Sequence, residues 1–203
     1  MNIDFSFVPK HYASRSHEKM MEVLMDPTAK GPAIHYYMIR GGKDQKNITV
    51  WEPGTVGGEY IKTYGHYHVG HLDETYWFIY GQGVMMMQKL ETAGNGEMIA
   101  NKVTEFKAKK VKAGDSVFIP SGYGHLVANI GATYFATADD SPVSFEDKKD
   151  EASMPGHADY KKVQEMQGFA FYLIEKDGEP VFVRNKKYAE IKSYDLGGIP
   201  LVE

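Results

Sequence analysis

Hydrophobic and polar residues follow one pattern near the N-terminus of this chain and another over the rest of it. Residues 16–27 (SHEKMMEVLMDP) carry apolar side chains at a broad helical period and end at Asp26–Pro27, where a proline stops a helix. We therefore expect one short helix there, with an apolar stripe made of Met20, Met21, Val23, Leu24 and Met25.

From residue 33 onward the chain consists of short segments rich in β-branched and aromatic residues. Most of them are separated by Gly, Pro, Asn or Asp, which are typical of turns. This succession of short strands predicts an antiparallel sandwich or barrel. In chain order the segments are AIHYYMIRGG, NITVWEPG, EYIKTYG, ETYWFIYGQG, VMMMQKLE, MIANKVTEF, DSVFIPSG and ATYFATA.

Two further stretches lie beyond these strands. Residues 145–162 (FEDKKDEASMPGHADYKK) are dense in charge and predict a long surface loop with at most a helical turn. Residues 167–185 predict a hairpin that is closed at Asp177–Gly178. Because no repeat or linker is visible, we expect one all-β domain. It comprises an N-terminal arm with a short helix (1–45), a barrel core (46–140), and a loop, hairpin and C-terminal extension that completes the domain (141–203).

Composition narrows the chemistry of any site. The 203 residues include no cysteine, so a metal site must use His, Asp, Glu or water, and thiol nucleophiles are excluded. A net charge of −4 gives no electrostatic reason to expect nucleic acid or an anionic membrane as a partner. The first residues do not resemble a signal peptide, and no apolar run approaches the ~20 residues that span a bilayer, so we expect a cytoplasmic protein.

The densest group of metal-binding side chains lies in HYHVGHLDE, residues 66–74. His66 and His68 are two residues apart, so on a strand they share one face and leave Tyr67 on the other. Glu74 begins the next aromatic strand, and a short loop folds it back beside the two histidines. Taken alone, such a pair is more often two solvent-exposed strand histidines, and His71 in the loop is the weakest candidate ligand.

A fourth candidate ligand lies far along the chain, at His125. Three imidazoles and one carboxylate suit a divalent first-row metal and leave positions open for water or substrate. Residues 114–129 read G-x5-P-x-G-x2-H-x3-N, the second signature of the cupin superfamily, and residues 66–81 read H-x-H-x5-E-x6-G, which resembles its first signature. The resemblance implies a cupin jelly-roll β-barrel, in which Asn129 is a turn residue rather than a ligand.

The first signature departs from the general cupin pattern, because Tyr60 stands where glycine is usual and the gap between His68 and Glu74 is long. These departures indicate a subgroup. The segments PGTVGGEYIKTYGHYH (53–68) and ETYWFIYGQG (74–83) resemble the archaeal-type, cupin glucose-6-phosphate isomerases. PGHADY (155–160) and the hairpin after it also resemble that family's AGHDY segment and hairpin.

The resemblance implies both a metal site and a substrate site. One divalent ion per subunit, with Fe²⁺ favoured over Mn²⁺, Ni²⁺ or Zn²⁺, would be bound by His66, His68, Glu74 and His125. Thr49, Thr63 and the backbone of Gly65 would hold a phosphate, Tyr76 would be an active-site tyrosine and His157 a pocket histidine. The family's tyrosine before AGHDY has no counterpart in TADDSPVS, residues 137–144. A homodimer is also implied.

The expected activity is the metal-dependent interconversion of glucose 6-phosphate and fructose 6-phosphate, an aldose–ketose isomerisation of glycolysis and gluconeogenesis. A Lewis-acid metal polarises the carbonyl, and Glu74, the only acid so placed, carries the proton through an enediol. A metal-assisted hydride shift is the other route. Lys62 and Arg40 are either further cations for the phosphate or solvated charges. Two alternatives stay open: another cupin enzyme (a different sugar isomerase or a metal dioxygenase), or a non-catalytic sugar-binding cupin.

Overall fold

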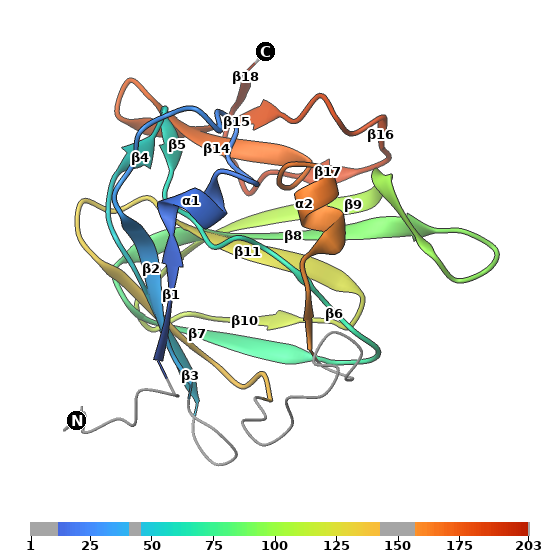
Figure 1. Ribbon diagram of the computed structural model, residues 1–203, viewed down its shortest axis with the longest axis horizontal. Helices are drawn as coiled ribbons and strands as arrows, with labels where there is room; N and C mark the ends of the chain where they lie inside the picture. Colours follow the sequence, from blue (N-terminus) through green and yellow to red (C-terminus); the bar gives the residue numbers. More distant parts are fainter. Residues whose placement is uncertain (1–11, 41–45, 143–156, 203) are drawn as a thin grey trace.

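The computed structural model describes residues 12–40, 46–142 and 157–202. Over these residues the chain forms mostly antiparallel sheets and two short helices, α1 (His17–Met20) and α2 (Lys161–Glu165). The expected all-β fold is confirmed, since two sheets face each other as a jelly-roll barrel (Figure 1).

The first sheet of the barrel has six strands in the order β1-β2-β3-β12-β7-β10. They are β1 (Tyr12–Ser16), β2 (Ile34–Ile39), β3 (Asn47–Trp51), β12 (Phe135–Asp139), β7 (Glu74–Tyr80) and β10 (Ser116–Ile119). The second sheet joins β11 (Tyr123–Asn129), β8 (Gln82–Thr92), β9 (Met98–Lys112), β16 (Glu190–Ile191) and β17 (Tyr194–Asp195).

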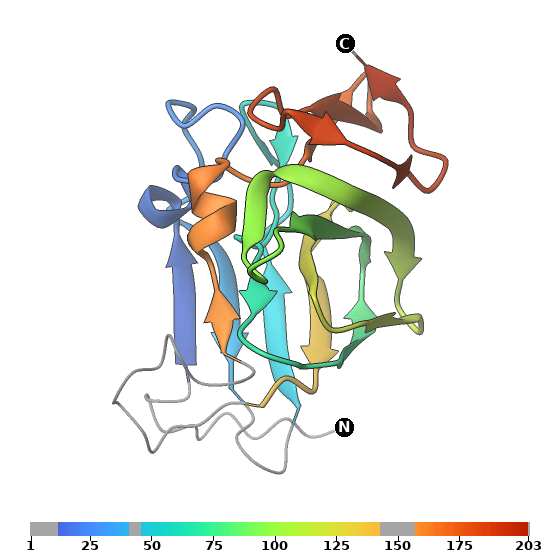
Figure 2. The same ribbon diagram turned by 90° about the vertical axis from the view of Figure 1, so that its right-hand side faces the viewer.

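A third sheet covers one end of the barrel, at the top of Figures 1 and 2. It contains β18 (Leu201–Val202), β15 (Glu179–Arg184), β14 (Phe171–Lys176), β5 (Glu59–Tyr60) and β4 (Thr55–Val56). A two-stranded ladder pairs β6 (Tyr67–His68) with β13 (Ala158–Asp159). The third sheet packs on β9 through the ring of Phe106, whose centroid lies 4.8 Å from that of Phe171.

The main core lies between the first two sheets. Aromatic rings fill it from neighbouring strands, with the ring centroid of Phe135 at 5.4 Å from that of Trp51 and at 5.8 Å from that of Phe78. Met85 and Met86 of β8 are both buried, so this strand packs on both faces. Complete burial of one such side chain stabilises the fold by about 1.5–3 kcal/mol.

The helix is shorter than the predicted segment of residues 16–27. Ser16 caps α1, because its hydroxyl accepts a hydrogen bond from Lys19 N, but the helix ends at Met20. Further along, Pro27 has no N–H, so Val23 O has no helical donor four residues on. The Lys62 ammonium donates to Val23 O instead, at 2.8 Å, so a tertiary contact replaces the helical bond.

The predicted C-terminal hairpin is present as β14 and β15. Asp177 and Gly178 both have positive φ, at 54° and 81°, as a two-residue turn that matches the strand twist requires. Because β14 also pairs with β5, and β2 with β3, the N- and C-terminal segments share sheets with the barrel. The division of the domain at residues 45 and 140 stays a prediction, and most of the predicted loop at 145–162 falls outside the described residues.

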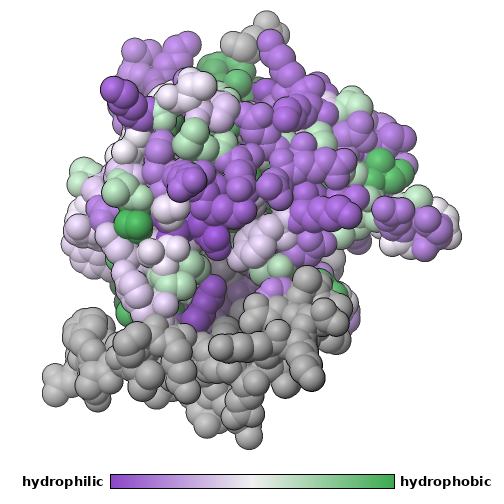
Figure 3. Space-filling view, in the orientation of Figure 1, coloured by the Kyte–Doolittle hydropathy of each residue, from purple (hydrophilic) through white to green (hydrophobic). Residues whose placement is uncertain are grey.

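The surface shown in Figure 3 is largely hydrophilic, with small scattered hydrophobic patches. Among the described residues, neither helix is long and apolar enough to cross a membrane.

Candidate metal centre

Three separate parts of the chain bring four metal-binding side chains together inside the barrel. The ligand atoms of this group all lie within 4.8 Å of one another, and its members are His66, His68, Glu74 and His125. Glu74 Oε2 lies 2.9 Å from His68 Nε2 and 3.2 Å from His125 Nε2. The structure thus brings together the four residues that the sequence motifs select, and it leaves the loop residue His71 exposed to solvent.

Backbone hydrogen bonds hold the histidines in place. His66 and His125 form an isolated antiparallel bridge, in which His66 N donates to His125 O at 3.2 Å and His125 N donates to His66 O at 3.0 Å. Tyr67 turns to the opposite side, where its hydroxyl accepts a hydrogen bond from Gln88 Nε2. Gly124 permits this packing, because a Cβ there would lie 2.5 Å from the Tyr67 ring.

Burial dominates the electrostatics of the cluster. Burial raises the pKa of Glu74 to about 7, although the hydrogen bond with His68 opposes this shift. Burial and the neighbouring His68 lower the pKa of His125 to about 3. Burial, followed by the charges of His125 and His68, also lowers the pKa of His66 well below its usual value. The imidazoles of His66 and His125 are therefore neutral at neutral pH, as metal ligands must be.

The donor set fits a divalent first-row cation. Both ring nitrogens of His125 are buried, and neither makes a hydrogen bond of good geometry with the described residues. Such unsatisfied nitrogens are costly in a core unless another partner binds them. A cation held by three nitrogens and one carboxylate would satisfy them and offset the burial of Glu74.

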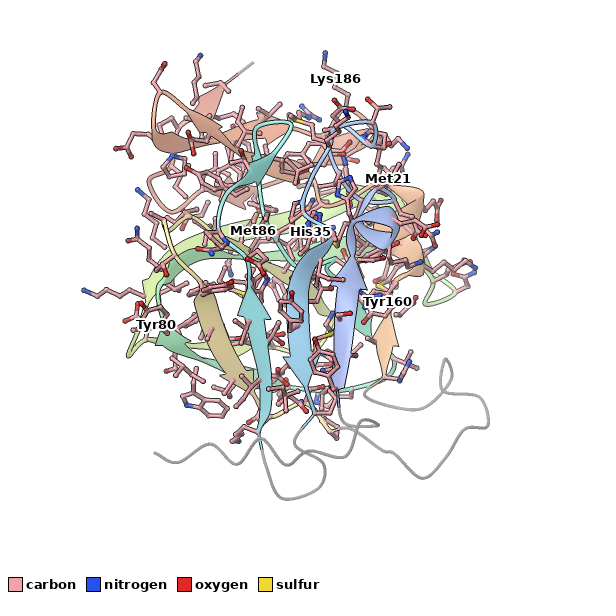
Figure 4. All side chains as sticks on the ribbon, turned by 60° about the vertical axis from the view of Figure 1, so that its left-hand side comes forward. Met21, His35, Tyr80, Met86, Tyr160 and Lys186 are labelled. Carbon is pink, nitrogen blue, oxygen red and sulfur yellow. The ribbon has the colours of Figure 1, made fainter. Side chains whose placement is uncertain are left out.

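Aromatic side chains line the cluster. The Tyr76 ring lies 5.5 Å from that of His125, and burial raises the pKa of Tyr76 well above its usual value, so its hydroxyl stays protonated. Tyr160 lies 5.6 Å from the His66 ring and meets the Tyr64 ring edge-on at 5.2 Å. Figure 4 shows Tyr160 beside the β13 ribbon, far from the exposed Tyr80. No spacing in the sequence marks Tyr160 as a site residue, although it ends the PGHADY segment.

An arginine from the N-terminal arm also reaches this region. The Arg15 guanidinium lies 5.5–5.9 Å from the ring centroids of Tyr36, Tyr64 and Tyr160. Its Nε donates to the Tyr36 hydroxyl at 3.0 Å. The charge of Arg15, together with that of Arg40, contributes to the lowered pKa of His66. No sequence motif marks Arg15, because its place depends on the pairing of β1 with β2.

The predicted phosphate residues lie on several segments of the barrel. Thr63 is tied to β11, since its N donates to Val127 O at 2.9 Å and its hydroxyl accepts from Val127 N at 3.0 Å. Thr49 is buried on β3, and Gly65 adopts a positive φ of 81° next to His66. His157 O accepts a hydrogen bond from Val69 N, which places His157 beside the end of β6. Their role in phosphate binding stays a prediction.

Two expectations about charged residues are wrong. Lys62 is neither a solvated charge nor a cation available to phosphate, because it is buried and pairs with Glu59 at 2.5 Å. Glu74 is also not the only acid at the site. Asp139 is buried at the end of β12, opposite Tyr76, and its charge contributes to the raised pKa of Glu74.

Known proteins resemble this chain over most of its length. A family model described as glucose-6-phosphate isomerase (GPI) matches residues 36–190. The glucose-6-phosphate isomerase of Thermococcus onnurineus is 32% identical over 143 residues, which cover 69% of this chain and 62% of that protein. The enzyme of the same name from Pyrococcus furiosus is 32% identical over 144 residues, with 69% and 62% covered. The chain thus spans 62% of the length of these relatives.

Solved structures overlap with smaller parts of the fold. The match with oxalate decarboxylase from Bacillus subtilis covers 46% of this chain and 20% of the decarboxylase chain, with 22% identity and a TM-score of 0.32. The capsular polysaccharide assembling protein CapF from Staphylococcus aureus covers 60% and 30%, with 18% identity and a TM-score of 0.39.

Proposed function

The chain belongs to the glucose-6-phosphate isomerase family, and on this premise we propose that it is a metal-dependent isomerase that interconverts glucose 6-phosphate and fructose 6-phosphate. The observation that carries the proposal is the cluster of three imidazoles and one carboxylate beside Tyr76. The cluster combines a metal site with an acid that can exchange a proton.

One divalent cation per subunit would be held by His66, His68, Glu74 and His125. Fe²⁺ is our first choice, and Mn²⁺, Ni²⁺ and Zn²⁺ suit the same donors. When bound, the cation supplies Lewis acidity that polarises a sugar carbonyl and stabilises the developing oxyanion.

Two side chains at the site can act on the sugar directly. Glu74 offers a carboxylate beside the reacting carbons, where it can take a proton from one carbon and return it to the next. The Tyr76 hydroxyl stays protonated and is therefore a hydrogen-bond donor to a sugar oxygen. Because both side chains are buried, bulk water is kept away from the proton during its transfer.

The phosphate of the sugar would bind on the Arg15 side of the cluster. Thr63 and Gly65 immediately precede the ligand His66, and Tyr64 N donates to the Tyr36 hydroxyl, which also accepts from Arg15. Hydroxyl and backbone N–H donors together with a nearby guanidinium suit a phosphate. Thr49 and His157 complete the proposed phosphate residues.

The setting of the activity is also part of the proposal. We propose that the protein acts in glycolysis and gluconeogenesis in the cytoplasm and that it forms a homodimer. Exposed aromatic side chains on the first sheet, such as Tyr12 and Phe118, provide apolar surface for a second copy.

A coupled assay tests the proposal directly. Fructose 6-phosphate is supplied to the purified protein, and formation of glucose 6-phosphate is followed before chelation, after chelation and after each metal is restored. We expect turnover that chelation abolishes and metal restores. Absence of metal-dependent turnover would reject the isomerase, and oxygen consumption with a keto acid or aromatic substrate would favour a dioxygenase instead.

A further inference from the structure

Strand β12 ends at Asp139, a buried acid beside the metal centre. Its partners in the sheet are Asn47 on β3 and Tyr76 on β7. Directly opposed residues on paired strands project from the same face, so Asp139 projects from the face that carries Tyr76. The Tyr76 ring contacts the ring of His125, and Asp139 is 3% exposed. Asp139 therefore lies inside the barrel, next to the metal ligands.

Neighbouring groups hold the Asp139 carboxyl in one orientation. Asn47 Nδ2 donates to Oδ1 at 2.6 Å, and Ser141 N donates to the same oxygen at 3.2 Å. Asn47 Nδ2 also donates to Ser141 O at 2.9 Å, which closes a small network. The carboxyl also makes a side-chain hydrogen bond with Glu74, one of the four candidate metal ligands. Asn47 and Ser141 thus fix Oδ1, and the carboxyl faces the cluster at Glu74.

Neighbouring groups oppose the cost of burying this acid without removing it. Burial raises the pKa of Asp139, while the Asn47 hydrogen bond and the charge of Arg40 oppose the rise. The described residues nevertheless form no ion pair with it within 4.0 Å. Two positions earlier on the same face, the Thr137 hydroxyl is buried without a hydrogen-bond partner among the described residues. Buried polar groups left unsatisfied are costly, so Thr137 is a group on β12, two positions from Asp139, that a polar ligand would satisfy.

We propose that Asp139 is a substrate-recognition residue, whose carboxylate accepts hydrogen bonds from hydroxyl groups of a sugar phosphate at the metal centre. The inference rests on the proposed isomerase function. A carboxylate only accepts hydrogen bonds, and the hydroxyls of the sugar chain are donors beside the reacting carbonyl. A phosphate would be repelled by this charge, so the sugar lies with its hydroxyl-bearing carbons toward Asp139 and its phosphate toward Arg15.

The variant Asp139→Asn separates recognition from a structural role. Asparagine keeps a carbonyl oxygen for Asn47 and Ser141 N but removes the charge and the second carboxylate oxygen. In the metal-loaded protein we expect the KM for fructose 6-phosphate to rise about 10- to 100-fold, the worth of a hydrogen bond to a charged group. Metal content, the thermal midpoint and inhibition by inorganic phosphate should stay at wild-type values.

Asp140→Asn is the matched control. Asp140 is the next residue, but its side chain is partly exposed and its carboxyl pairs with Lys46 and accepts from Thr75 N. The KM of Asp140→Asn for fructose 6-phosphate should equal that of the wild type. A wild-type KM in Asp139→Asn would overturn the inference, and so would loss of metal from that variant, since Asp139 would then support the metal rather than the sugar.

A binding measurement keeps this inference distinct from the proposed function. If the wild-type protein does not isomerise either sugar phosphate, the proposed function fails. Calorimetric titration of the metal-loaded protein with fructose 6-phosphate then decides the role of Asp139. Binding that is about tenfold weaker in Asp139→Asn than in the wild type supports recognition, and equal or undetectable binding in both overturns it.

Discussion

At the scale of single residues, Gly124 permits close packing beside the candidate metal centre. A Cβ at this position would lie 2.5 Å from the Tyr67 ring, so Gly124→Ala must push the ring or β11 aside next to His125. We expect the free energy of unfolding to fall by about 1–3 kcal/mol, as overpacking usually costs. Urea denaturation measures this loss, and elemental analysis should show a lower metal content.

Gly94→Ala is the control for that experiment. A Cβ at Gly94 has no atom within 4 Å, so this substitution should leave the free energy of unfolding and the metal content at wild-type values. Wild-type behaviour of Gly124→Ala would show that the Tyr67 ring does not pack against β11 as described.

Some site residues can be predicted from local spacing in the sequence. The positions of the others depend on which strands pair, and local spacing does not give that. Residues two positions apart on a strand project from the same face, so the spacing alone predicts that His66 and His68 lie together. Asp139 reaches the site only because β12 lies between β3 and β7, and its partner Asn47 is 92 residues away in the chain. Arg15 likewise depends on the pairing of β1 with β2. No local pattern of residue types specifies such long-range pairings.

At the scale of elements, a buried ion pair ties the segment after α1 to the barrel. Lys62 pairs with Glu59, the first residue of β5, and donates to Val23 O, while Glu59 Oε2 accepts from Met25 N. Glu59→Gln would leave the Lys62 charge buried without its counter-ion. We expect a loss of about 3–5 kcal/mol in the free energy of unfolding, measured by urea denaturation.

The exposed residue Glu190 provides the comparison. It lies 4.0 Å from Lys102 on the surface, where ion pairs are screened by water, so Glu190→Gln should change the free energy of unfolding by less than about 1 kcal/mol. Similar losses in the two variants would contradict the structural role of the Lys62–Glu59 pair.

The contact between α1 and β2 predicts a pH dependence of stability. His17 Nδ1 lies 2.9 Å from His35 Nε2, and His17 Nε2 lies 3.0 Å from Ala29 O. Burial, followed by the charges of His17 and Lys62, lowers the pKa of His35 to about 4. In the unfolded chain the pKa of histidine is about 6.5, so the unfolded state binds more protons between these two values. Stability therefore falls as pH drops below 6.5.

Chemical denaturation at pH 7 and pH 5 measures this effect. From the two pKa values, His35 should contribute a loss of about 2 kcal/mol over that interval. His35→Gln should remove this part of the pH dependence, whereas His71→Gln, at an exposed position, should retain it. An unchanged pH dependence in His35→Gln would show that other groups cause it.

Elements were predictable where local chemistry decides them. The hairpin follows from Asp177–Gly178, since both positions need a positive φ that these residues tolerate. The segment after Ser16 has a suitable apolar stripe. Its carbonyl oxygens, however, accept hydrogen bonds from side chains elsewhere in the chain, such as Lys62 and Gln167. Those contacts exist only in the folded chain, so the stripe alone overestimates the length of α1.

At the scale of the whole molecule, the four candidate metal ligands come from both sheets of the barrel. Glu74 begins β7 in the first sheet, and His125 lies in β11 of the second. A cation that binds both would oppose separation of the sheets, and it would bind the folded state alone. Such binding stabilises by about 2.7 kcal/mol when the free ligand is at a hundredfold excess over its Kd.

Removal of metal should therefore lower the thermal midpoint of the protein, and added Mn²⁺ should raise it progressively with concentration. Circular dichroism during heating, over a series of Mn²⁺ concentrations after chelation, measures the response. His125→Ala should lose the response, because one of four ligands is gone, while His71→Ala should keep it, because its side chain is 84% exposed outside the cluster. A wild-type midpoint independent of Mn²⁺, or an undiminished response in His125→Ala, would contradict the assignment of these four residues as the link between the sheets.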